Sequence, residues 1–278
     1  MESINYLITS IDENIAIGWN ELLSTDIANW DVFEAYVAGS SFAIWIMMYR
    51  IMDQFKVLNK YRFEKDKNAP VVLFLPDPNN SWIPLISYIL IIHLYHYIYP
   101  KPLCPMEAPP IVRLVIECII GFVVYDFLFF WVHLLMHLTP KLAFIHQHNV
   151  HHHQKFLTAS EVQHHSLLDS IFQVGINIAV QNISLPFYGR KHYASRLLHN
   201  VLITYMLTES HAGYDFPWSL HNLFPLVYGG AKRHEAHHKY NNIYYQQFLI
   251  YLDDIYNYVT NNVEKVKKQH NANGGKKE

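Results

Sequence analysis

More than half of the nineteen histidines in this chain fall in three clusters, so the chemistry of imidazole is the first feature to explain. The first cluster is the pair His133 and His137, whose spacing places both rings on one face of a helix. Two such rings can bind one metal ion. Because the pair stands beside Trp131 and Leu134, the two histidines could also be interfacial residues that bind no metal. The spacing alone therefore does not show whether they bind one.

The other two clusters each contain the pattern HxxHH. Its members are His148, His151 and His152 in one cluster, and His234, His237 and His238 in the other. A single HxxHH also fits a pH-responsive patch or an adventitious zinc site. Three clusters of one chemical type in one chain are hard to explain in that way, and together they predict metal binding. His146 and His153 flank the earlier HxxHH and leave its register ambiguous.

The composition of the chain favours an integral membrane protein. Hydrophobic residues make up 51% and charged residues only 16%, below the roughly 25% of an ordinary soluble domain. A net charge of -2 excludes the basic footprint of a nucleic-acid-binding protein. Two cysteines are too few for a disulfide framework or a cysteine-based zinc site, and the acidic N-terminus is not a cleavable signal peptide.

The apolar segments predict an all-α protein with about four membrane spans, or two helical hairpins, and a histidine-rich cap on the cytosolic side. These segments are residues 35–49, 81–100, 111–131, 170–189 and 197–208. The basic loop within residues 56–67 should be cytosolic, and the proline-rich loop 100–110 lumenal. The last two segments predict a hairpin turning at Pro186–Arg190, and whether it spans the bilayer stays open. Because a hairpin reverses the chain, residues 211–278 should be cytosolic too.

This topology divides the chain into three regions and places all three clusters at one membrane face. We expect an amphipathic segment at the membrane surface over residues 1–34, a membrane-embedded domain over 35–260, and a polar, disordered cytosolic tail over 261–278. His211 lies at the cytosolic end of the predicted hairpin and is a candidate for a further ligand.

The number of imidazoles and their setting favour a pair of iron ions. Eight or nine rings exceed the roughly four to six ligands of one ion, and imidazole binds iron, copper, zinc and nickel alike. The substrate expected in a bilayer presents unactivated C–H bonds. Breaking such a bond needs an oxidant made from dioxygen, and two irons can share the electrons that this requires.

Acidic residues near the clusters could hold the rings and set their tautomers. The candidates are Asp126, Asp169, Glu209, Glu235, Asp253 and Asp254. Each could equally be an ordinary surface or capping acid. Asp126 is unusual because it shares an apolar segment with Arg113 and Glu117, and charges at membrane depth usually face inward.

The order HxxxH, HxxHH, HxxHH resembles the fatty-acid hydroxylase and sterol-desaturase superfamily. The stretch Glu209–His221, ESHAGYDFPWSLH, is most similar to the branch that hydroxylates a sterol side chain, and Tyr228-Gly-Gly follows it. The segment YDFLFFWVH at Tyr125–His133 and the proline-rich loop before it also fit. The resemblance covers roughly residues 80–260.

The resemblance implies an endoplasmic-reticulum membrane enzyme with two iron ions that uses dioxygen. Its electrons would come from NAD(P)H through a separate reductase and a small b-type cytochrome, and its substrate would be a sterol or another lipid. It implies ligand roles for His133, His137, His148, His151, His152, His211, His234, His237 and His238.

Other activities remain open beside sterol side-chain hydroxylation. Neighbouring branches oxidise a C4 methyl group of a sterol or desaturate a lipid with the same centre. A different class is a non-catalytic membrane protein that binds lipid in response to zinc or pH. The chain also departs from the family pattern, with one inserted residue near the earlier HxxHH. His164 and His165 lie near the place where other branches have a further histidine.

Overall fold

Helices dominate the computed structural model, which describes residues 2–63, 83–99, 104–139, 141–142, 145, 147–152 and 156–272. Besides the long helices described below, these residues form α1 Glu2–Leu23, α3 Ile83–Ile98, α6 Asn149–His152, α9 Leu220–Leu223, α11 Tyr251–Thr260 and α12 Asn262–Ala272, with 3-10 turns at Asp26–Asn29, Lys56–Tyr61 and Ala159–Gln163. The predicted helical class is confirmed.

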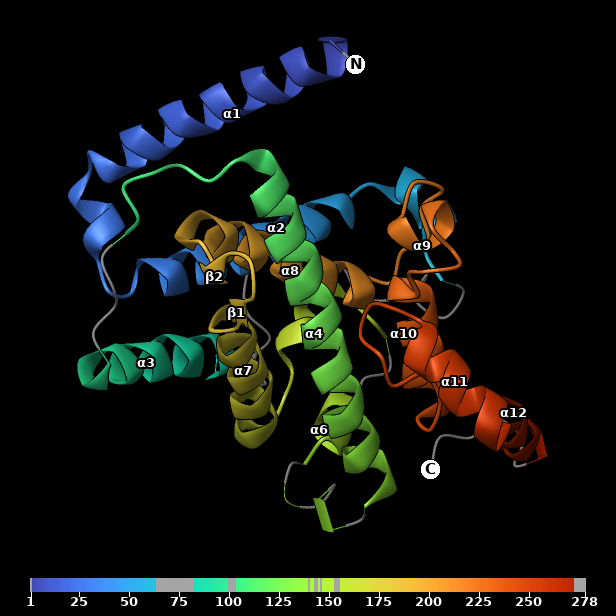
Figure 1. Cartoon of the computed structure of the whole chain (residues 1–278). Coiled ribbons are helices and arrows are strands. Elements are labelled where there is room, and N and C mark those ends of the chain that lie inside the picture. The colour runs from blue at the N-terminus through green and yellow to red at the C-terminus, as the bar shows by residue number, and fades with distance from the viewer. Residues whose placement is uncertain are drawn as a thin grey trace.

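The longest helix, α4 (Ile111–Leu138), runs through the middle of the molecule (Figure 1). It begins directly after Pro109 and Pro110, and its first amide, that of Ile111, donates to the side chain of Asp12 at 2.7 Å. A proline before the first turn and an acid at the N-terminus both favour a helix start at this point. At about 1.5 Å per residue, its 28 residues exceed the roughly 30 Å of a hydrocarbon core.

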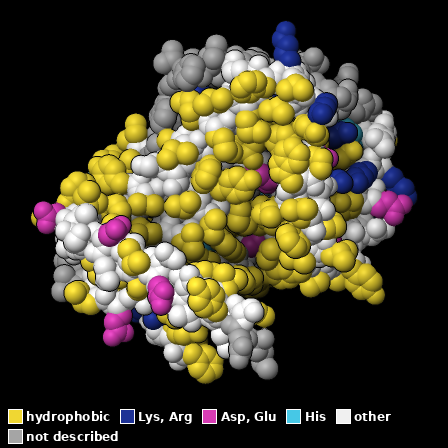
Figure 2. Space-filling model, turned by 90° about the horizontal axis from the view of Figure 1, so that it is seen from above, with side chains coloured by type: hydrophobic (Ala, Val, Ile, Leu, Met, Phe, Trp, Pro, Cys, Tyr) yellow, Lys and Arg dark blue, Asp and Glu magenta, His cyan; other side chains and the backbone are white. Residues whose placement is uncertain are grey.

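One side of α4 is an exposed apolar stripe. Its members follow one another at intervals of four residues: Val115, Ile119, Val123, Phe127 and Trp131. The opposite side is buried, because Leu114, Cys118 and Tyr125 face the other helices. Apolar side chains also cover much of the molecular face seen in Figure 2. An apolar stripe of this length on the outside of a protein is the surface expected to meet lipid.

Two other helices pack side by side behind α4 (Figure 1): α2 (Phe33–Met52) and α8 (Tyr193–His211). Trp45 of α2 donates to the backbone oxygen of Val201 of α8 at 3.1 Å. Helix α7 (Leu167–Gln181) packs against α4. The main core lies where these helices meet, and Tyr125 of α4 stacks there on Phe248 with ring centroids 5.8 Å apart.

The predicted hairpin is built as two helices joined by a small ribbon. Strand β1 (Ser184–Leu185) follows α7 and pairs antiparallel with β2 (Gly189–Arg190), which precedes α8. The chain therefore reverses at the predicted turn. In Figure 1 α7 crosses the direction of α8. Among the described residues, two helices, α2 and α4, are long and apolar enough to cross a membrane, whereas α7 is apolar but shorter.

The ends of the chain are helical as well. Helix α1 lies apart from the other helices along most of its length (Figure 1), with Trp19 near its end donating to the backbone oxygen of Pro105 at 3.0 Å. Residues 262–272, expected to belong to a disordered tail, form α12. Glutamate, lysine and glutamine are good helix formers, and Glu264 pairs with Lys268 one turn later at 2.6 Å. A helix can therefore form there without any buried residue.

Candidate metal centre

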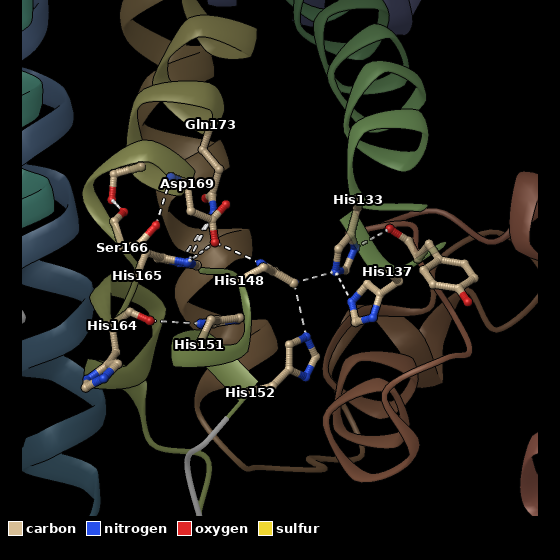
Figure 3. A network of polar contacts seen from close by, with 12 residues as sticks. His133, His137, His148, His151, His152, His164, His165, Ser166, Asp169 and Gln173 are labelled. Carbon is tan, nitrogen blue, oxygen red and sulfur yellow. Dashed lines mark hydrogen bonds and ion pairs between the residues drawn. The ribbon is translucent and has the colours of Figure 1, made fainter. Parts of the chain in front are cut away.

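The predicted ligands come together because four helices meet at one end of the molecule. His133 and His137 lie in the last turns of α4, and His211 is the last residue of α8. The short helix α6 and the loop before it carry one HxxHH pattern, and α10 (Gly230–Tyr240) carries the other. Figure 3 shows the rings from α4 and from the α6 region turned toward one another.

The nine histidines form two groups, and within each group the candidate ligand atoms lie within 4.8 Å of one another. The first group is His133, His137, His148, His152 and His237, and the second is His151, His211, His234 and His238. Each HxxHH pattern is thus divided between the groups, since neighbouring helical positions point in different directions. The sequence clusters did not predict this division.

Within each group the Nε2 atoms are separated by the distance expected for ligands of a shared ion. Nε2 of His148 lies 3.0 Å from Nε2 of His133 and 3.1 Å from that of His152. In the second group, Nε2 of His234 lies 2.8 Å from Nε2 of His211. Two nitrogens bound to one ion at about 2.1 Å and at right angles are about 3.0 Å apart.

The second ring nitrogen, Nδ1, shows which nitrogen is free to bind a metal. Five Nδ1 atoms donate to oxygen atoms around the groups: His133 to Tyr245 O (2.8 Å), His148 to Asp169 Oδ2 (2.8 Å), His151 to His164 O (3.2 Å), His211 to Leu207 O (2.8 Å) and His237 to Ile243 O (2.7 Å). In a neutral ring a proton on Nδ1 leaves a bare lone pair on Nε2. Lone pairs about 3 Å apart repel one another, and a cation between them removes that repulsion. The donor sets therefore fit one metal ion in each group.

Burial keeps these rings neutral. His234, His237 and His238 of α10 are almost inaccessible to solvent. Burial, followed by the neighbouring histidines, holds the pKa of each of these three well below its ordinary value. A neutral imidazole is the form that binds metals, so the packing around α10 prepares the ligands.

Asp169 is the predicted acid that contacts a ligand directly (Figure 3). Its carboxylate accepts from His148 and lies 3.2 Å from Nδ1 of His165. Helix α7 begins beside it because Ser166 caps the backbone N–H of Asp169 at 3.1 Å. His165 also stacks on His151 with ring centroids 4.1 Å apart. His165 therefore lies beside the second group without belonging to it.

Two further acids act through the backbone of residues 245–249. Asp126 of α4 accepts from the amides of 247, 248 and 249 at 2.7–3.1 Å, and from the side chain of Gln246 at 2.6 Å. Asp253 accepts from the amides of Tyr245 and Gln246 at 2.6 and 3.1 Å. Because the carbonyl of Tyr245 accepts from His133, this pair of acids positions a ligand indirectly.

The remaining candidate residues lie farther from the ligands. Asp254 pairs with Arg233 at 2.7 Å and is half exposed. Glu209 lies 3.5 Å from His221, a buried histidine that the sequence analysis did not single out and that also bonds Asp215 at 2.9 Å. A histidine twelve residues after a glutamate gives no periodic signal from which this contact could be predicted.

Four further candidates belong to neither group or lie outside the described residues. Glu235 is buried in α10 and belongs to neither histidine group. The backbone oxygen of His164 accepts from His151. The ring of His164 belongs to neither group. His146 and His153, which flank the earlier HxxHH pattern, lie outside the described residues.

The relatives of this chain agree with the expected resemblance. It is 30% identical to cholesterol 25-hydroxylase of Mus musculus over 71% of this chain and 64% of that protein, and 28% identical to the human enzyme of that name over 71% of each. It is also 28% identical, over 68% of its length and 69% of the relative, to a very-long-chain aldehyde decarbonylase of Oryza sativa subsp. indica. The mouse match thus spans slightly less than two thirds of that relative. No solved structure matches this chain.

The match to a family model covers the residues of the site. The fatty acid hydroxylase model matches residues 118–258, about half of the chain. This range begins in α4 before His133 and ends in α11 after Asp253, so it contains both histidine groups and the acids that hold them. The chain therefore belongs to the fatty acid hydroxylase family.

Proposed function

We propose that this protein is a membrane-bound monooxygenase that hydroxylates the side chain of a sterol, as the names of the mouse and human relatives suggest. The observation that carries the proposal is the pair of adjacent, buried histidine groups at the end of an apolar helix. Two iron ions bound there would supply the activation of dioxygen, with electrons from NAD(P)H through a reductase and a b-type cytochrome.

The chain's own residues would hold the ions, orient the rings and exclude water. Asp169 and the backbone oxygens of residues 207, 243 and 245 keep protons on Nδ1, so each Nε2 faces inward. Burial of the rings removes competing water and keeps the ligands neutral. The exposed stripe on α4 leads from the opposite end of that helix toward His133, which suits a substrate that arrives from the bilayer.

The setting of the site is part of the proposal. We place the protein in the endoplasmic-reticulum membrane with both histidine groups on the cytosolic side, where soluble electron donors can reach them. The basic residues Lys56, Lys60 and Arg62 follow α2, and the positive-inside rule assigns that end of α2 to the cytosol. Four membrane spans, or two hairpins, remain our expected topology.

Product analysis in a sterol-producing host without its own enzyme tests this function. We expect a sterol with one added oxygen in its side chain, identified by mass spectrometry. His237→Ala should abolish the product, while His270→Ala, in α12 and outside both groups, should leave it unchanged. A product with a new double bond and no added oxygen would instead support a desaturase.

A second chemistry is favoured by the rice relative, whose name describes a decarbonylase acting on very long aldehydes. The same host supplied with long-chain aldehydes would yield hydrocarbons one carbon shorter if that activity applied. Purified protein that holds zinc and consumes no oxygen would contradict both activities and support a lipid-binding regulator.

A further inference from the structure

A cavity of about 110 Å³ lies among α2, α4, α7 and α8, close to the second histidine group. At one end are His165 and Gln173, whose side chains approach to 3.3 Å (Figure 3). Asn177, one helical turn after Gln173 on α7, and Asn200 of α8 form a second polar part of the lining. The walls between them are mostly apolar, and the residues described as lining the cavity include no lysine, arginine, aspartate or glutamate.

Hydrogen bonds fix the orientation of the side-chain amides of Asn177 and Asn200. Glu34, which as a carboxylate can only accept, accepts from Nδ2 of Asn200 at 3.1 Å. Oδ1 of Asn200 must then face the other way, where it accepts from Nδ2 of Asn177 and Nε2 of Gln181, both at 3.0 Å. Arg196 holds the second oxygen of Glu34 at 2.8 Å, so the network cannot simply reverse.

This orientation leaves an acceptor without a donor. Because Asn177 must present its amino group to Asn200, its oxygen Oδ1 is directed elsewhere, and this buried atom has no hydrogen-bond partner among the described residues. Oδ1 of Asn177 belongs to a residue that lines the cavity. A buried acceptor without a donor costs about 1–3 kcal/mol, so a ligand that supplies a donor there is stabilised.

We propose that Asn177 accepts a hydrogen bond from the hydroxyl group of an uncharged lipid alcohol, with the body of that lipid extending toward His165. An alcohol fits because it donates one hydrogen bond and is otherwise apolar. An ammonium donor would lose its hydration in an apolar cavity without a carboxylate to pair with it. The identification of the lipid as the substrate rests on the proposed function.

The position of Asn177 sets the distance between the hydroxyl and the carbon that reacts. Asp169, which bonds the ligand His148, lies eight residues before Asn177 on α7, a rise of about 12 Å. A sterol bound by its 3-hydroxyl would place its side chain, and not the neighbouring C4 methyl groups, at the histidines. The cavity is smaller than a whole sterol, so binding one requires the surrounding helices to move apart.

Binding of two matched sterols to the purified full-length protein in lipid nanodiscs tests the proposal. In the 3-methyl ether of cholesterol a methyl group replaces the hydroxyl proton, so the ether cannot donate a hydrogen bond. The affinity of each compound is measured by its competition with a photoreactive sterol for binding. We expect the ether to bind about 3- to 10-fold more weakly, the effect of one net hydrogen bond. Equal affinities in the unchanged protein would overturn the proposal without any variant.

Variants then assign the effect to Asn177. Asn177→Leu should lower the affinity for cholesterol to that for the ether, whereas Asn182→Leu, at the exposed residue directly after α7 and outside the cavity, should keep the preference. Thermal unfolding and metal content show whether both variants are folded. If Asn177→Leu is not, Asn177→Ala takes its place. A preference that survives loss of the Asn177 amide would overturn the assignment.

Failure of this inference and failure of the proposed function are distinguishable. Selective binding of the hydroxyl without any oxidised product would uphold the Asn177 site and overturn the monooxygenase. An oxidised sterol formed equally well from cholesterol and its ether would uphold the enzyme and overturn the site. A product oxidised on a C4 methyl group would overturn the proposed binding direction.

Discussion

At the scale of single residues, the two nitrogens of each ring have separate tasks. Nε2 points into a group, and for five rings Nδ1 is bonded to a carbonyl or a carboxylate outside it. Asp169 differs from the other four acceptors because it is charged, and it also lies beside His165. A charged acceptor makes the bound ring a stronger donor of electron density to a metal.

Replacing this acid should weaken metal binding more than folding. In Asp169→Asn, the amide cannot match the carboxylate as an acceptor for His148, so we expect about 10- to 100-fold weaker metal retention. Metal content after dialysis against a chelator measures this change. Asp254→Asn is the matched control, because Asp254 is half exposed and pairs with Arg233. Equal retention in both variants would contradict the role of Asp169.

Acid should also release the metal and destabilise the protein. The pKa of His234, His237 and His238 is held well below the ordinary value by burial, so below about pH 6.5 the unfolded chain binds protons that the folded chain does not. Their contribution to stability is present above that pH and is lost as the pH falls. We expect the thermal unfolding midpoint to decrease from pH 7 to pH 5.

The contribution of His221 to stability depends on pH in the opposite direction, which makes this residue a useful control. Burial alone would lower its pKa, but the neighbouring carboxylates of Glu209 and Asp215 raise it above the ordinary value. Its stabilisation is therefore full below about pH 6.5 and is lost as the pH rises. His221→Gln should thus steepen the loss of stability toward acid. A midpoint that falls no more steeply with acid in His221→Gln than in the unchanged protein would contradict this role of His221.

At the scale of elements, the position of the site depends on how closely α4 and α8 approach. Gly121 of α4 faces Lys191 just before α8 and His199 within it. His199 is fully buried and stacks on Phe122 with ring centroids 4.8 Å apart. Since α4 and α8 each end in ligands of the two groups, their contact here sets how those ligands meet.

A single added methyl group should disturb this contact. In Gly121→Ala the new Cβ would lie 2.7 Å from Nδ1 of His199 and 2.9 Å from Nζ of Lys191. The stacked imidazole cannot easily move, so we expect a loss of about 1–3 kcal/mol in the free energy of unfolding. Gly175→Ala is the matched control, because no atom lies within 4 Å of that Cβ, and a helical alanine there should stabilise by up to about 1 kcal/mol.

Thermal unfolding of both glycine variants in detergent micelles gives the comparison. A Gly121→Ala protein at least as stable as the unchanged one would show that the two helices can separate at no cost. A loss in Gly175→Ala as large as in Gly121→Ala would show that the alanines act through something other than this contact.

At the scale of the whole molecule, the two ends of α4 have different surroundings. The histidine groups lie at one end, and the proline-rich loop and α1 lie at the other (Figure 1). Exposed apolar residues of α4 lie between these ends. This arrangement suits a molecule that crosses a bilayer with its two ends in different compartments.

Labelling from one side of the membrane tests this arrangement. Met106 lies in the proline-rich loop before α4, Lys239 follows the candidate ligand His238 in α10, and both are exposed. In a chain with Cys104→Ser, we expect a membrane-impermeant maleimide to label Lys239→Cys in intact microsomes, and Met106→Cys only after permeabilisation. Equal labelling of both in intact vesicles would contradict a membrane between the two ends.

Much of this protein could be predicted from local patterns. Ligand spacing in HxxxH and HxxHH depends on the helical repeat, and apolar segments of helical length identify α2 and α4. The turn at Pro186–Arg190 follows from the residue types at that position. Residues 262–272 of the predicted disordered tail are helical instead, because helix-forming residues and a lysine–glutamate pair form α12.

Local sequence patterns predict which histidines could bind a metal and that an apolar chain surrounds them, because both depend on neighbouring residues. How the nine rings divide into two groups depends on the packing of the helices, since His151 and His152 are adjacent in the chain and point to different groups. The same holds for Asp126, whose partners lie more than one hundred residues away, and for the free acceptor of Asn177, whose orientation is set by Glu34 through Asn200. Such contacts arise from the packing of distant helices, and no local pattern contains them.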